Sequence, residues 1–226
     1  TMGMFVLIIA IGIVGFIVQA RLQSVFKKYS KVQFPGGLTG AEVAEKMLRD
    51  NNIHNVKVTH VGGHLTDHFN PQTMTVNLSD SVYSSTSVAA AAVAAHECGH
   101  AVQHAHAYAP LKMRSSLVPV ISFASNWMMW VLLIGMFTLN VFPQIMLFGI
   151  ILFAATTLFS FITLPVEIDA SRRAVKWLSE AGVTNNRNYG AAVSALRSAA
   201  YTYVVAALGS LATLLYYVMI FLGRRD

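Results

Sequence analysis

The segment AAHECGHAVQHAH, residues 94–106, places titratable side chains in an alanine-rich stretch that is otherwise typical of an apolar helix. His96 and His100 are four residues apart, so on a helix both imidazoles lie on one face and can bind the same ion. Neutral imidazole suits zinc, and Glu97 can accept a proton from a metal-activated water. The H-E-x-x-H pattern therefore predicts a zinc hydrolase with one Zn²⁺ per chain. The alternative is a buried pair of structural histidines.

A third ligand is needed, because a catalytic zinc usually takes three protein ligands and keeps one position open. His104 continues the same helix face, but a rise of about 1.5 Å per residue puts it about 12 Å along the helix from His96. A zinc–nitrogen bond is only about 2 Å long. The third ligand is therefore expected from another segment.

Glu167, in LPVEIDASRRA (164–174), is the predicted third ligand. The chain has only ten Asp and Glu residues, and Glu167 directly follows an apolar segment. A carboxylate in that position is costly unless it is paired or coordinated. Ala170, Ser171 and Ala174 share its face on a helix, and their small side chains would let this helix pack closely against the HECGH helix.

Two other interpretations of Glu167 remain open. It could be a carboxylate at a helix N-terminus, or the ion-pair partner of Arg172 or Arg173. Asp169, two residues further on, would face away from Glu167 on a helix and is not expected to be a ligand.

The composition indicates a membrane protein. Hydrophobic residues make up 55% of the chain and charged residues 12%, whereas a soluble domain carries about 25% charged residues. Four segments without Asp, Glu, Lys or Arg are predicted to be transmembrane helices: residues 4–20, 117–139, 145–166 and 201–222. The first segment is short, but it lacks a basic flank and an A-x-A-like cleavage site, so we expect a retained anchor rather than a signal peptide.

The charge distribution predicts the orientation. Net charge is +6, and fourteen of the sixteen Lys and Arg residues lie in 21–114 and 172–197. The positive-inside rule places both stretches on the cytoplasmic side of the membrane, which the chain crosses several times. Neither stretch interleaves basic and aromatic residues, so no nucleic acid is expected as a partner. The single cysteine, Cys98, excludes an intramolecular disulfide framework.

The expected fold class is a mainly α integral membrane protein with four transmembrane helices and a small α+β zincin-like cytoplasmic domain, which carries the HExxH helix. The domain is expected at 21–115, and a second cytoplasmic segment with the third ligand at 167–198. Capping, alternation and turn residues predict its elements: a helix at 42–51 behind a Thr39 capping box, strands at 56–61 and 73–79, and the HExxH helix at about 86–108, stopped by Pro110.

The strand at 73–79 leads toward the HExxH helix. Metallopeptidases bind an extended substrate, and an open strand edge binds one through main-chain hydrogen bonds. Thr75, Val76 and Asn77 are therefore candidates for substrate contact, and the alternative is an ordinary paired strand.

The histidines at 60, 64 and 68 are also spaced by four, which would suggest a second metal site. Gly62 and Gly63 make a continuous helix through them improbable. We expect instead a loop that carries Asp67 and His68 toward the cleft, where either could assist catalysis. The alternative for His68 is a surface histidine.

Three stretches together resemble a known family. DHFNPQTMTVNLSDSVY (67–83), VAAHECGH (93–100) and LPVEIDASRRA, which follows two spans, resemble the bacterial YugP-type neutral zinc metallopeptidases, a membrane family. The resemblance covers nearly the whole chain. It implies His96, His100 and Glu167 as zinc ligands and Glu97 as the catalytic acid and base.

A wider similarity is to gluzincin membrane proteases of the HtpX and CAAX-prenyl-protease type, whose third ligand lies in an E-x-x-A-D pattern. Glu167 and Ala170 match this pattern, but Ser171 stands where the family has Asp, and in those relatives that Asp supports a histidine ligand. Candidates for the supporting role here are Asp169, Asp67 and Ser171. Candidates for stabilising the oxyanion are His104, His68, Arg187 and Arg197.

The sequence thus predicts a membrane zinc endopeptidase at the cytoplasmic face, acting on peptides or membrane proteins in contact with the lipid bilayer. The alternative is a non-catalytic zinc-binding regulator or partner subunit of a protein quality-control complex. Glu97 favours the enzyme, because a purely structural zinc site has no use for it. A proton or metal transporter is disfavoured, because the four spans carry no Asp, Glu, Lys, Arg or His.

Overall fold

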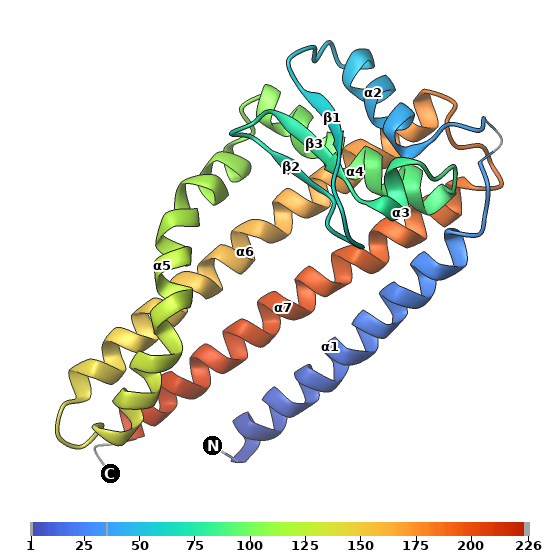
Figure 1. Ribbon diagram of the computed structural model, residues 1–226. Helices are drawn as coiled ribbons and strands as arrows, with labels where there is room; N and C mark the ends of the chain where they lie inside the picture. Colours follow the sequence, from blue (N-terminus) through green and yellow to red (C-terminus); the bar gives the residue numbers. More distant parts are fainter. Residues whose placement is uncertain (1, 35, 224–226) are drawn as a thin grey trace. The chain divides into compact units, whose positions relative to one another are not determined.

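The computed structural model describes residues 2–34 and 36–223 and is mainly helical (Figure 1). In chain order its elements are α1 (Met2–Tyr29), α2 (Gly40–Asp50), β1 (Lys57–His60), β2 (His68–Asn70), β3 (Thr75–Leu78), α3 (Asp80–Tyr83), α4 (Val88–Ala105), α5 (Ala109–Phe137), α6 (Pro143–Glu180) and α7 (Tyr189–Gly223). The expected fold class is confirmed: four long apolar helices accompany a small mixed sheet and a helix that carries the HExxH pattern.

Four helices, α1, α5, α6 and α7, are long and apolar enough to cross a membrane by length and composition. α1, α6 and α7 extend beyond both ends of the apolar segments predicted from the sequence, whereas α5 begins earlier than its predicted segment and ends at Phe137, two residues before the predicted end. In α6 the helix continues through Pro165, because a proline's fixed φ is compatible with a helix and the cost is one missing backbone hydrogen bond. Glu167 therefore lies inside a long helix, which rules out its interpretation as a residue at a helix N-terminus.

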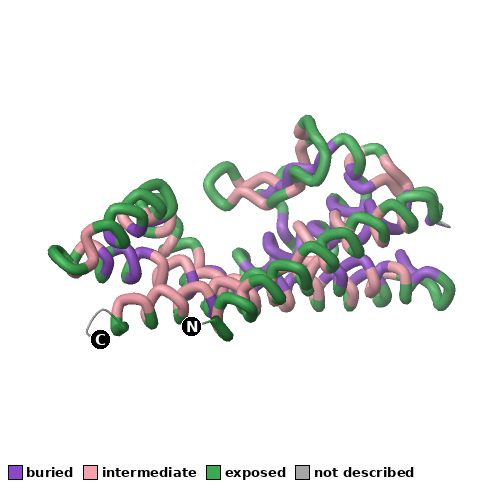
Figure 2. The backbone as a smooth tube through the Cα atoms, turned by 90° about the horizontal axis from the view of Figure 1, so that it is seen from below, coloured by how far each residue is buried: buried purple, intermediate pink, exposed green. Residues whose placement is uncertain are grey.

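The chain forms two compact units. One contains the chain up to Ile17, Lys112–Pro165 and the chain from Thr202 onward. Its packing includes a buried cluster of Leu132, Met146 and Ile150. Large apolar side chains remain exposed along its helices, and α1 has no buried residue (Figure 2). Such exposed apolar surface suits contact with lipid acyl chains.

The other unit contains Val18–Leu111 and Val166–Tyr201. Its three strands are ordered β1-β3-β2, with β1 parallel and β2 antiparallel to β3. Helix α4 packs against α2, α3, β2 and β3. Its alanines at 89–92, 94 and 95 are all buried, and those at 90–92, 94 and 95 belong to the main core, together with Val76, Leu78 and Leu178. Small side chains along α4 allow its neighbours to approach closely.

Local sequence signals explain where the helices of this unit begin. The Thr39 hydroxyl accepts a hydrogen bond from the Glu42 backbone N–H, as the capping box predicts. The Ser87 hydroxyl caps α4 by accepting from the Ala90 backbone N–H at 3.1 Å. Both caps satisfy backbone donors that would otherwise lack a partner.

The C-terminal end of α4 differs from the prediction. The helix ends at Ala105, before the predicted end near residue 108, and Ala107 has φ 52°. The Tyr108 N–H donates to the Gln103 carbonyl and the Ala107 N–H to the His104 carbonyl, which is the Schellman arrangement. Glycine is the usual residue at such a position, so an alanine there gave no stop signal. Pro110 lies in the first turn of α5 rather than ending α4.

Candidate metal centre

Helices α4 and α6 bring His96, His100 and Glu167 together. The His96 Nε2 atom lies 2.9 Å from Glu167 Oε2, and the His100 Nε2 atom lies 3.4 Å from Glu167 Oε1. One potential ligand atom from each of the three residues lies within 4.8 Å of the others. His100 and Glu167 are buried and His96 is half-buried. The three residues predicted from the sequence as ligands thus form one cluster.

The close approach of the two helices depends on small residues. A Cβ atom on Gly99 would lie 2.6 Å from the Ala170 carbonyl oxygen and 3.1 Å from the Ala170 Cα atom. Ala170 and Ala174 on α6 are fully buried. The small face predicted for the segment after Glu167 is therefore the face that contacts α4.

Each imidazole has a partner on its other ring nitrogen. Ser171 Oγ lies 3.0 Å from His96 Nδ1, and Gln103 Oε1 lies 3.0 Å from His100 Nδ1. These contacts leave both Nε2 atoms directed toward Glu167. Ser171 was one of three candidates for supporting a histidine. Gln103 was missed, although its position three residues after His100 on the same helix face was a usable signal.

Asp169 contacts neither histidine, so its predicted role in supporting one directly is wrong. Its Oδ2 atom accepts from Gln103 Nε2 at 2.8 Å and from Arg173 Nε at 2.7 Å. The Arg173 guanidinium also lies over the Tyr108 ring, 5.7 Å from its centroid. Arg173, one of the two arginines considered as an ion-pair partner of Glu167, thus pairs with Asp169.

The donor set fits zinc. Two imidazoles and a carboxylate form one of the ligand sets of catalytic zinc sites. Bonds of about 2.0–2.1 Å in a tetrahedron separate the ligand atoms by about 3.3–3.4 Å. The separations of 2.9 and 3.4 Å join the histidines to different oxygens of Glu167, and one ligand atom from each residue lies within 4.8 Å of the other two. The side chains would therefore have to move closer together to coordinate one ion.

The residues between the two histidines differ in burial. Glu97 is half-buried, whereas Cys98 is fully buried and its thiol donates to the Ala44 carbonyl of α2. Burial, with a smaller contribution from the charge of Glu97, raises the pKa of the Cys98 thiol. A neutral thiol facing α2 is a packing group rather than a ligand or a nucleophile.

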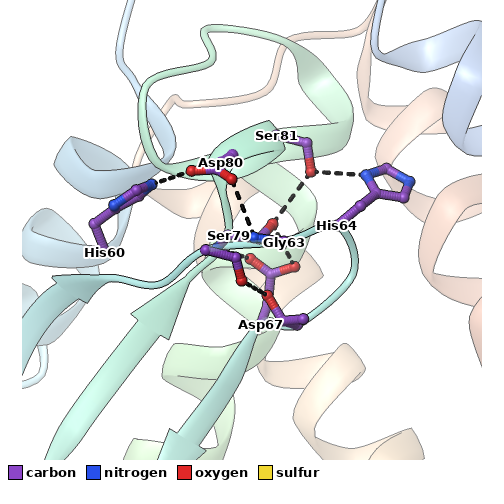
Figure 3. A network of polar contacts seen from close by, with 9 residues as sticks. His60, Gly63, His64, Asp67, Ser79, Asp80 and Ser81 are labelled. Carbon is purple, nitrogen blue, oxygen red and sulfur yellow. Dashed lines mark hydrogen bonds and ion pairs between the residues drawn. The ribbon is translucent and has the colours of Figure 1, made fainter.

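Asp67 belongs to a separate polar network (Figure 3). Its two carboxylate oxygens accept from the Ser79 backbone N–H and hydroxyl at 2.7 and 3.0 Å. Because the histidine Nδ1 atoms are bound to Ser171 and Gln103, the prediction that Asp67 supports a ligand is wrong. Asp67 instead ties the segment before β2 to the end of β3.

The histidines near Asp67 do not form a metal site with one another. His60 contacts Asp80, and His64 Nδ1 lies 3.2 Å from the Ser81 hydroxyl (Figure 3). Hydrogen bonds from the Gly63 backbone N–H and from His60 lower the pKa of the Asp80 carboxyl. As expected from Gly62 and Gly63, the segment is a loop between strands rather than a helix.

The strand predicted to bind substrate is the central strand of the sheet. β3 pairs with β1 on one side and with β2 on the other, and Thr75, Val76 and Asn77 all lie within both ladders. The expectation of an open edge at these residues is therefore wrong, because their main chain is already paired. The edge strands are β1 and β2. β2 was not predicted from its three residues, which read as part of a loop.

The candidates for oxyanion stabilisation lie on different elements. His68 on β2 contacts the Thr66 carbonyl through Nδ1 and the Asn77 amide through Nε2. The exposed His104 ring on α4 packs against Phe69. The other two candidates, Arg187 in the α6–α7 connection and Arg197 on α7, are exposed.

Comparisons with known proteins agree with this geometry. Residues 4–222 match the family described as "Putative neutral zinc metallopeptidase". The chain is 44% identical over 224 residues to "Putative membrane protease YugP" of Bacillus subtilis (strain 168), covering 98% of this chain and 97% of that protein. No solved structure gives a significant match. The chain therefore belongs to the family of neutral zinc metallopeptidases.

Proposed function

We propose that this protein is a membrane zinc endopeptidase whose site faces the cytoplasm. The observation that carries the proposal is the cluster of His96, His100 and Glu167, with Glu97 adjacent to the first ligand on the same helix. A site that served structure alone would usually be closed by a fourth protein ligand. Among the described residues, the cluster offers three, which leaves one position for water or substrate.

The proposed chemistry divides between metal and protein. Zinc held by the two Nε2 atoms and the Glu167 carboxylate would polarise the scissile carbonyl and acidify the attacking water. Glu97 accepts the proton of that water and delivers it to the leaving amine. Ser171 and Gln103 hold the imidazole rings in position. The Glu167 carboxylate would supply one negative charge that partly neutralises the Zn²⁺ ion.

An extended substrate would add to the open edge of β2. This strand packs against α4 and pairs with β3 on one side only. Its short length limits the main-chain hydrogen bonds it can offer, so side-chain pockets would contribute much of the selectivity. His68 and His104 lie on these two elements and remain candidates for contacting the substrate carbonyl.

The cytoplasmic orientation rests on charge. Residues 21–114 and 172–197 carry fourteen of the sixteen Lys and Arg residues. His96 and His100 lie in the first of these stretches, and Glu167 lies five residues before the second. Peptides or membrane proteins are the expected substrates. The competing proposal, a non-catalytic zinc-binding regulator or partner subunit of a quality-control complex, predicts zinc without hydrolysis.

The deciding experiment measures zinc content and peptide hydrolysis on the purified full chain in detergent, for wild type and Glu97→Gln. We expect about one zinc in both and cleavage by wild type alone, because Gln cannot accept the proton. Glu45→Gln, at an exposed position on α2, is the matched control and should behave like wild type. Cleavage by Glu97→Gln at the wild-type rate would refute the mechanism, and zinc in both variants without any cleavage would favour the regulator.

A further inference from the structure

Gln103 is a fully buried polar residue on α4 that contacts the candidate ligand His100. Its side chain is 0% exposed, and its carboxamide makes three hydrogen bonds. Oε1 lies 3.0 Å from His100 Nδ1. Nε2 donates to the Val166 carbonyl at 2.9 Å and to Asp169 Oδ2 at 2.8 Å. Burying this amide costs little only because all three contacts are made.

The partners of Gln103 fix which way its amide points. A backbone carbonyl can only accept a hydrogen bond. The Asp169 carboxylate, paired with Arg173, is also an acceptor. Both must therefore face the NH₂ group of Gln103, which has two hydrogens to donate. The amide oxygen is then left for His100, and reversing the amide would place oxygen against oxygen at two contacts.

The orientation of the amide in turn fixes the proton of His100. Because Gln103 Oε1 can only accept, His100 Nδ1 must carry the hydrogen of their bond. In the zinc-free protein Nε2 faces the Glu167 carboxylate, which is itself an acceptor and favours a hydrogen on Nε2 as well. A ring that coordinated zinc through Nε2 would lose that hydrogen and remain protonated on Nδ1 alone. This is the tautomer a metal ligand requires, since the coordinating nitrogen must be unprotonated.

We propose that Gln103 is the positioning residue of the second histidine ligand: it holds a hydrogen on His100 Nδ1 and thereby presents Nε2 as the coordinating nitrogen. Asp169, held by Arg173, keeps the amide in its working orientation. The inference rests on the metal site of the proposed function, but not on hydrolysis. The bond to the Val166 carbonyl also ties α4 to the residue that precedes Glu167, so one amide positions two ligands.

The other histidine lacks an equivalent device. His96 Nδ1 contacts the Ser171 hydroxyl, and a hydroxyl can donate or accept. That contact is compatible with either tautomer of His96, so it orients the ring without setting its proton. The control over protonation is thus concentrated on His100, the more buried of the two imidazoles.

Two substitutions separate the tautomer effect from simple anchoring. Gln103→Met keeps the size and removes every hydrogen bond. Gln103→Glu keeps an acceptor for His100 but can offer at most one donor, when its carboxyl is protonated, to the two acceptors Val166 and Asp169. Gln72→Met, in an exposed turn, is the control for the change of residue type. Each full-length protein is purified in detergent, and its thermal unfolding is recorded to verify folding.

Two readouts that do not depend on activity are then compared. Zinc affinity is measured by chelator competition, and the ring nitrogens of His100 in the zinc-free protein are observed by ¹⁵N NMR, assigned with a His100→Gln variant. We expect Gln103→Met to weaken zinc binding about 10–100-fold, as for other residues that orient a metal ligand, and to mix the tautomers. Gln103→Glu should retain the Nδ1-protonated ring and most of the zinc affinity while unfolding at a lower temperature.

Equal losses of affinity in Gln103→Met and Gln103→Glu would overturn the proposal, because the amide would then only join the helices. A His100 ring without a hydrogen on Nδ1 in zinc-free wild type would also overturn it, and this measurement needs no variant to fold. Failure of the peptidase proposal is a separate result: wild type that binds zinc but cleaves nothing leaves the tautomer and affinity measurements interpretable.

Discussion

The two units of the molecule each contain a glycine where helices meet backbone to backbone, and they use it for different ends. A Cβ on Gly99 would lie 2.6 Å from the Ala170 carbonyl oxygen, and a Cβ on Gly135 would lie 2.7 Å from the Met146 Cα atom. Gly135 approaches Met146, which belongs to an apolar cluster with Leu132 and Ile150. The Gly99 contact is flanked by the polar contacts of His96 and His100 with α6. The close approach of two helices packs apolar side chains in one unit and brings the candidate metal ligands together in the other.

Alanine at these two glycines should separate the two roles and produce the largest contrast. Helix propensity would favour Ala by about 1 kcal/mol, but overpacking against rigid backbone costs about 1–3 kcal/mol. In Gly99→Ala, α6 must move away and carry Glu167 with it. A displacement of about 1 Å in a catalytic group costs about 100-fold in rate, so we expect hydrolysis and zinc affinity to fall together.

Gly135→Ala is the matched variant. It should lower thermal stability by a similar amount while zinc content and the rate per folded molecule stay near wild type. Peptide hydrolysis, zinc titration and thermal unfolding on both variants make the comparison. Loss of zinc in Gly135→Ala, or full activity in Gly99→Ala, would show that the two contacts are not specialised in this way.

Removing the charge of Glu167 tests the site more narrowly. Glu167→Gln preserves the size of the side chain but removes the anionic ligand, so zinc affinity should fall further than the roughly 10–100-fold typical of residues that merely support a ligand. Glu180→Gln, exposed at the end of the same helix, is the control. Zinc content after dialysis is the readout. A Glu167→Gln protein that retained wild-type zinc would remove this residue from the ligand set.

The comparison also explains what the sequence could and could not predict. The helix period places His96 and His100 on one face, and the scarcity of acidic residues singles out Glu167. The cluster could therefore be predicted from the sequence. The spacing of Gln103 from His100 would also have allowed its prediction. It was missed because its role depends on Val166 and Asp169, which belong to α6. Ser171 stands where the E-x-x-A-D pattern has Asp, and only the structure shows that the serine hydroxyl contacts His96.

The sheet was harder to predict for a physical reason. The alternation at 73–79 identifies β3, but strand order depends on contacts between distant segments, which alternation does not encode. β2 has three residues and α3 four, too few for any period to be visible. The alternation therefore could not show that β3 is the central strand, with the main chain of Thr75, Val76 and Asn77 already paired.

The smallest predicted effect compares two partly buried hydroxyl contacts, one in each unit. Ser171→Ala removes the partner of His96 Nδ1, and Thr157→Val removes the 2.6 Å contact with Ser210. The His96 ring is still held by packing against His100, with ring centroids 4.8 Å apart, so we expect a loss of zinc affinity near the lower limit, about 10-fold. Thr157→Val should cost only about 0.6 kcal/mol of stability, the average for a hydrogen bond between membrane helices, and leave zinc affinity unchanged.

Chelator competition and thermal unfolding on the two variants measure these effects side by side. If Ser171→Ala weakened zinc binding as much as Gln103→Met, the two histidines would be supported equally, and the proposed concentration of control on His100 would be wrong. If Thr157→Val altered zinc affinity, the unit that contains Thr157 would be energetically coupled to the metal site. Distinct responses would mean that a hydroxyl can orient a ring but that an anchored amide is required to set its proton.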